Sequence, residues 1–129
     1  MAGGMEVRDA HFPGRPPLDA YGNGGFRFAG MSHRGSIMLL PSGIWAWPPR
    51  GVTEIDAASL SRPLGEASEI DLLLIGTGRD PWRLPDGLQE LLHGAGIRFD
   101  LMPTAAAAST YNVLLDEGRR VAAVLIATD

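Results

Sequence analysis

The sequence predicts a single three-layer α/β domain, and three observations point to it. The chain has 129 residues, close to the usual size of one domain. Its first half holds short apolar runs separated by glycine and proline, which favours a small antiparallel β unit. Its second half alternates strand and helix patterns in the order β-α-β-α-β, which is typical of right-handed crossovers and a largely parallel sheet.

Composition excludes several classes of protein. Apolar residues make up 45% and charged residues 20% of the chain, as in globular domains. With 11 basic against 15 acidic residues, a net charge of -4 and no long basic run, nucleic acid is not an expected partner. Cysteine is absent, which excludes disulfides and thiolate metal sites and suits a reducing cytoplasm. No apolar stretch reaches the ~20 residues of a transmembrane segment.

The expected domain organisation is an arm followed by one folded unit. Residues 1–17 are rich in glycine and proline and contain no apolar signal-peptide core, so we expect a flexible arm. Residues 18–129 contain no repeat, heptad seam or Ser/Gly linker, which predicts one α/β domain.

The antiparallel unit begins with a hairpin. The turn cluster of residues 21–25 precedes Phe26 and Phe28, which flank Arg27 at strand spacing. Further extended pieces are predicted over residues 36–40 and 44–47, each stopped by proline. Asp56 then has the position of a cap for a short helix carrying Leu60.

The second half follows the α/β pattern. Residues 70–75 form an almost continuous apolar run, which predicts a central strand covered on both faces. A helix is predicted from Pro85 to a cap at Gly94, followed by a strand with one wet face over 97–101. A second helix is predicted from Pro103 to Gly118, and a final strand over 120–127.

Several stretches, in order, resemble one known family. They are Tyr21-Gly22-Asn23-Gly24-Gly25-Phe26, Gly35-Ser36-Ile37, the Trp45 region, Ile75-Gly76-Thr77-Gly78, and Thr110-Tyr111-Asn112-Val113-Leu114 through Glu117-Gly118-Arg119-Arg120-Val121. They are similar to the small α/β domains that include the mitochondrial complex I assembly factor three and the adipogenesis-associated domain protein. The resemblance implies a compact β unit joined to a three-layer α/β part, no general enzymatic activity, and work with a protein partner.

A candidate pocket lies where the predicted parallel strands end. Gly76, Thr77 and Gly78 follow the central strand, and Thr104 begins a helix; exposed amides at such an edge can hold an anion or small ligand. A plain tight turn is the alternative, because the third glycine of a dinucleotide fingerprint is missing. No cofactor is therefore predicted.

Tyr111 and Asn112 complete this candidate pocket, since both lie on the second predicted helix. Either side chain could line a pocket. The alternative is that Tyr111 is a core aromatic residue and that Asn112 bridges to the backbone.

Trp45 and Trp47 form a candidate protein interface. They alternate on a short extended segment, so they face the same side, and tryptophan is enriched at binding hot spots. The alternative is that both rings pack inside the β unit.

The remaining residues suggest no catalytic chemistry. The three histidines, His11, His33 and His93, have no metal-ligand spacing, and no serine lies in a nucleophile elbow. We therefore predict a non-enzymatic protein-binding or assembly domain in the cytoplasm, which binds a protein partner or a second copy of itself. The alternatives are a small-ligand binder or enzyme that uses the crevice at the strand ends, and a stable scaffold.

Overall fold

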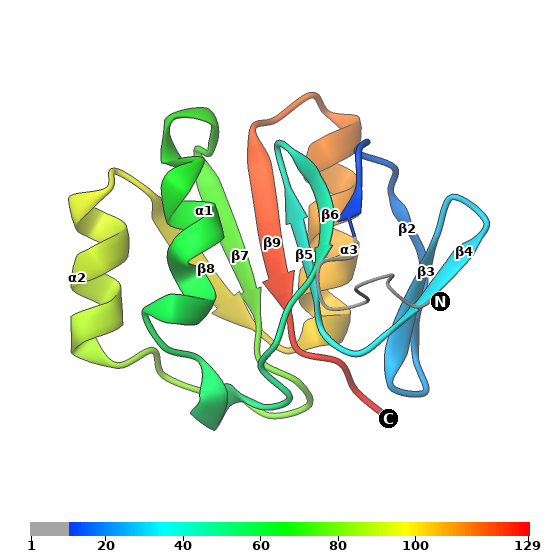
Figure 1. Ribbon diagram of the computed structural model, residues 1–129, viewed down its shortest axis with the longest axis horizontal. Coiled ribbons are helices and arrows are strands. Elements are labelled where there is room, and N and C mark those ends of the chain that lie inside the picture. The colour runs from blue at the N-terminus through cyan, green and yellow to red at the C-terminus, as the bar shows by residue number, and fades with distance from the viewer. Residues whose placement is uncertain (1–10) are drawn as a thin grey trace, which may run out of the picture.

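The computed structural model describes residues 11–129, which fold into two sheets flanked by helices (Figure 1). The larger sheet has six strands in the order β1-β6-β5-β9-β7-β8, and the smaller has three in the order β2-β3-β4. The strands β7, β8 and β9 run parallel to one another, whereas β5 is antiparallel to β9 and to β6. The predicted α/β class, with parallel strands in the second half and a small antiparallel unit in the first, is confirmed.

The strand bounds are as follows. The larger sheet contains β1 (His11–Phe12), β5 (Ile37–Leu40), β6 (Gly43–Ala46), β7 (Leu72–Gly76), β8 (Arg98–Met102) and β9 (Val121–Leu125). The smaller sheet contains β2 (Leu18–Gly22), β3 (Gly25–Phe28) and β4 (Met31–Arg34).

The smaller sheet is built on tight turns. Asn23 and Gly24 both have positive φ angles, as a two-residue hairpin turn of the primed type requires. Gly25 must also lack a side chain, because a Cβ atom there would lie 2.2 Å from the backbone oxygen of His33. These two demands explain the glycine cluster and confirm the predicted hairpin.

Two longer helices connect the parallel strands, and a series of short helices precedes them. The longer helices are α2 (Asp86–Gly94) and α3 (Thr104–Asp116). Before β7 the chain passes through η2 (Val52–Glu54), η3 (Ala58–Leu60), α1 (Ser61–Gly65) and η4 (Ala67–Glu69). Asp56 accepts a hydrogen bond from the Ser59 amide, as expected of a capping residue.

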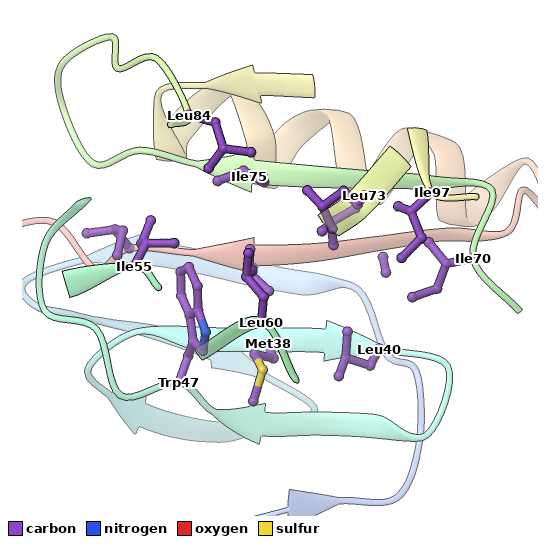
Figure 2. Packing of buried hydrophobic residues seen from close by; sticks show 14 residues of the cluster. Met38, Leu40, Trp47, Ile55, Leu60, Ile70, Leu73, Ile75, Leu84 and Ile97 are labelled. Atoms are coloured by element: carbon purple, nitrogen blue, oxygen red, sulfur yellow. The ribbon is translucent and has the colours of Figure 1, made fainter. Parts of the chain in front are cut away.

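Each face of the six-stranded sheet carries its own apolar core. On one face, the segment 52–70 and α2 bury Leu60 and Leu92 against strand residues such as Leu73 and Ile75 (Figure 2). On the other face, α3 and the smaller sheet bury Tyr111 and Phe28 among the side chains of β5 and β9. The domain therefore has three layers, with the sheet in the middle.

The structure corrects two details of the sequence prediction. The β5–β6 hairpin belongs to the larger sheet, because β5 pairs with β9. The left-handed residue after α2 is Gly96, with φ of +78°, rather than Gly94. The amide of Ile97 donates to the Leu92 carbonyl across that turn, which places the reversal two residues later than expected.

The predicted arm falls into two parts. Residues 1–10 lie outside the described residues. From His11 onward the chain contacts the domain: His11 and Phe12 pair with β6, and Arg15 donates to the Val121 carbonyl. The flexibility of an arm ending at Pro17 stays a prediction.

Candidate functional site

Four of the predicted pocket residues meet at the carboxyl ends of the parallel strands. Thr104 begins α3 and is 0% exposed. Its hydroxyl accepts a hydrogen bond from the Gly78 amide at 2.9 Å and donates one to the Ile126 carbonyl at 2.7 Å. Thr77 donates its hydroxyl to the Asp80 carbonyl at 2.7 Å. Both hydroxyls are therefore bound to the backbone.

Gly76 makes this arrangement tight. A Cβ atom at Gly76 would lie 2.7 Å from Leu125 Cδ2 and 3.0 Å from Thr104 Oγ1. The glycine lets α3 begin directly against the end of β7, with Thr104 packed beside Gly76. The strand ends are thus joined to one another by side chains and the backbone.

Tyr111 and Asn112 lie about two turns further along α3, away from the strand ends. Tyr111 is 1% exposed, and its hydroxyl accepts a 3.4 Å hydrogen bond from the Arg15 guanidinium. Burial raises the pKa of Tyr111, and the nearby Arg15 charge partly offsets this. The six predicted pocket residues therefore form two separate groups.

Asn112 connects α3 to the smaller sheet. Its side-chain oxygen accepts from the Leu18 amide at 2.9 Å, and its side-chain nitrogen donates to the Leu18 carbonyl at 2.8 Å. A single amide side chain thus satisfies both backbone groups of the first residue of β2, and little of it is left for a ligand.

The two tryptophans occupy different environments. Trp47 is 3% exposed, lies in the core beside Leu60, and donates its indole N–H to the Ser59 carbonyl at 2.8 Å (Figure 2). Its burial removes it from the surface that could contact a partner. Trp45 is partly buried and reaches the surface on β6.

The Trp45 ring is held by its neighbours. The His11 ring stacks on it with a centroid distance of 3.8 Å, and the Arg62 guanidinium lies 3.5 Å from the ring centre. The indole N–H donates to Ser42 Oγ at 2.8 Å. Contacts of this kind fix the orientation of a ring that solvent can still reach.

Ser42 links the tryptophan to a carboxylate. Its hydroxyl donates to Glu66 Oε2 at 2.6 Å, and its amide donates to Glu66 Oε1 at 2.9 Å. A nitrogen of His11 lies 2.8 Å from the Ser42 carbonyl oxygen. We call the group His11, Ser42, Trp45, Arg62 and Glu66 the Trp45 surface.

A hollow of about 400 Å³ lies beside this surface, between β6 and the segment 58–62. Trp45 and Arg62 form part of its wall, together with Met38 and Pro48. A second, smaller hollow of about 210 Å³ touches Trp45 and His11 near the β1 edge. The ring therefore stands between two depressions.

The chemistry of the Trp45 surface suits binding. It offers two stacked aromatic rings, one guanidinium and one carboxylate, and its serine hydroxyl already donates to Glu66 and accepts from Trp45. Within residues 11–129, no group of three or more histidine, aspartate or glutamate side chains is placed to hold a metal ion. No helix in the same range is long and apolar enough to cross a membrane.

Sequence reasoning found Trp45 but missed its partners. His11 comes from β1, and Arg62 and Glu66 come from α1 and its C-cap, so no local spacing links them to the tryptophan. Only Ser42 stands within one hairpin of Trp45, three residues away, and that spacing alone predicts no hydrogen bond.

Comparison with known proteins places this fold among relatives. An uncharacterized protein of Rhodobacter capsulatus is 43% identical over 95% of this chain and 93% of its own length. The NADH dehydrogenase [ubiquinone] 1 alpha subcomplex assembly factor 3 of the mouse is 29% identical over 95% of this chain. This chain spans 66% of the length of that mouse protein.

A solved structure agrees closely with the fold. It is described as an outer membrane protein from Bartonella henselae, is 54% identical, covers 92% of this chain and 100% of its own, and has a TM-score of 0.89. The family described as "Protein of unknown function (DUF498/DUF598)" matches residues 18–126. The predicted resemblance to the complex I assembly factor is thus confirmed, and the chain belongs to the DUF498/DUF598 family.

Proposed function

We propose that this chain is a non-enzymatic protein-binding domain with an assembly-factor-like role, and that the Trp45 surface contacts its partner. The observation that carries the proposal is the fixed Trp45 ring, held by Arg62 and His11 beside a hollow. Tryptophan and arginine are the residues most enriched at binding hot spots. A ring that is already oriented loses little entropy when a partner covers it.

Two further points support a protein partner. Relatives in the same family are named assembly factors of a multisubunit enzyme. The alternative site at the strand ends has less to offer a ligand, because Thr104 is buried there and its hydroxyl already makes two hydrogen bonds within the domain. A ligand-binding or enzymatic role at that crevice would require these contacts to open.

The cytoplasm is the compartment that we propose for this binding. The lack of cysteine suits it. The Bartonella relative is described as an outer membrane protein, so cell fractionation distinguishes the two locations. Recovery with the outer membrane would contradict our proposal.

Affinity capture from the protein's own cells at low salt tests the function. We expect a stoichiometric protein partner that is lost with Trp45→Ala and weakened with Arg62→Ala. Val113→Ala is the matched control, because Val113 is 56% exposed on α3, on the opposite face of the sheet. Unfolding curves establish that each variant is folded.

Two outcomes would contradict the proposal. One is a partner that binds the folded Trp45→Ala variant as tightly as the unmodified chain. The other is a co-purifying small molecule that is lost on substitution of Thr104, Tyr111 or Asn112, which would make the alternative site the functional one.

A further inference from the structure

Among residues 11–129, the strand β8 ends the larger sheet and has a neighbouring strand on one side only. It pairs with β7, and it is the last strand in the order β1-β6-β5-β9-β7-β8. The Met102 carbonyl accepts from the Thr77 amide, so the backbone groups of Arg98, Asp100 and Met102 point towards β7. Those of Phe99 and Leu101 therefore point away from the sheet.

The side chains of β8 are self-complementary. Arg98 and Asp100 are both exposed and lie on one face of the strand, on either side of Phe99. Neither is part of an ion pair among residues 11–129. The exposed face of this edge therefore carries one positive and one negative charge, two residues apart.

We propose that β8 pairs with β8 of a second copy of this chain, antiparallel and centred on Phe99. In this register, the outward-pointing amide and carbonyl of each Phe99 bond to those of the other. Arg98 then stands directly opposite Asp100 of the second copy, and the same pair repeats across the twofold axis. These are non-hydrogen-bonded positions, where facing side chains come closest.

Charge selects this register over its neighbour. Centring the pair on Asp100 would place two carboxylates directly opposite each other, which is destabilising. Centring it on Phe99 turns the same residues into two attractive pairs. The strand also lacks the proline or bulge that commonly protects an exposed edge.

The two edges of the sheet differ in what they offer. In the part of the chain that the structure describes, the opposite edge strand, β1, covers two residues, whereas β8 covers five. The Trp45 surface adjoins β1 and β6, so a second copy on β8 leaves it uncovered. The inference therefore goes beyond the proposed partner site, and each can fail independently of the other.

Charge reversal with sedimentation equilibrium tests the pairing. We expect a monomer–dimer equilibrium that Arg98→Asp or Asp100→Arg alone weakens roughly tenfold or more, since each converts two attractive pairs into two repulsive ones. The double variant Arg98→Asp/Asp100→Arg restores the opposite charges and is expected to restore the dimer. Arg50→Asp, a reversal at an exposed residue outside β8, is the matched control.

The proposed register also predicts a specific contact between the two copies. In a mixture of isotope-labelled and unlabelled chains, we expect an intermolecular contact between the Hα atoms of Arg98 and Asp100. A chain that stays monomeric at its solubility limit would overturn the proposal. A dimer that survives both single reversals, or that the double variant fails to restore although it is folded, would overturn it as well.

Discussion

The hydroxyl of Thr104 donates a 2.7 Å hydrogen bond to the backbone carbonyl of Ile126, and both groups are buried. The same hydroxyl accepts from the Gly78 amide, so one oxygen ties the beginning of α3 to the ends of β7 and β9. Its loss has consequences that can be measured.

We predict that Thr104→Val lowers the free energy of unfolding by roughly 2–4 kcal/mol, because it leaves a buried amide and a buried carbonyl without partners. Urea unfolding measures the change. Thr104→Ser keeps the oxygen and is the matched control, with an expected loss of about 1 kcal/mol from the missing methyl group. If Thr104→Val were as stable as the unmodified chain, these bonds would not be holding the strand ends together.

The amide of Asn112 is predicted to hold the smaller sheet in place. Asn112→Ala removes both hydrogen bonds to Leu18 and should cost roughly 1–3 kcal/mol of stability. Hydrogen exchange should accelerate in β2, β3 and β4 more than in β7 or β9. The neighbouring change Val113→Ala should leave exchange unaltered, and a uniform acceleration over both sheets would argue against a local tether.

The raised pKa of Tyr111 leads us to predict a loss of stability at alkaline pH. Burial raises the pKa of Tyr111 above its ordinary value of 10.0, so the folded chain keeps a proton that the unfolded chain releases. The stabilisation is complete below pH 10 and is lost as pH rises from there through the raised pKa. Tyr111→Phe should remove this loss in unfolding curves recorded across that range.

Tyr21 provides the control for the alkaline experiment. It is the other of the two tyrosines in the chain and is 46% exposed. Tyr21→Phe should leave the alkaline loss in place. Equal pH profiles for the unmodified chain and Tyr111→Phe would show that another group is responsible.

Most of the fold could be predicted from the sequence, because the patterns that indicate its elements are local. The apolar run before Gly76, the Asn23-Gly24 turn and the helix that begins at Thr104 each follow from neighbouring residues. The sheet to which the β5–β6 hairpin belongs could not be predicted in this way. Its pairing with β9 joins segments that are far apart in the chain.

The candidate site was harder to predict for the same reason. Placing Gly76 and Thr104 together required only the rule that parallel strands end at one edge. Whether that edge is open depends on the direction of the Thr104 hydroxyl, which is a matter of packing. Trp45 and Trp47 alternate along one predicted extended segment, yet only the fold distinguishes a core ring from a surface ring.

The position of β9 bears on how the chain is made. β9 joins the β5–β6 side of the larger sheet to the β7–β8 side, although it comes after the other five strands of that sheet in chain order. During translation the two sides have no common strand until residues 121–125 leave the ribosome. A nascent chain that stops before β9 therefore cannot complete the sheet, and the apolar residues of β5 and β7 lack their shared partner strand until residues 121–125 are available.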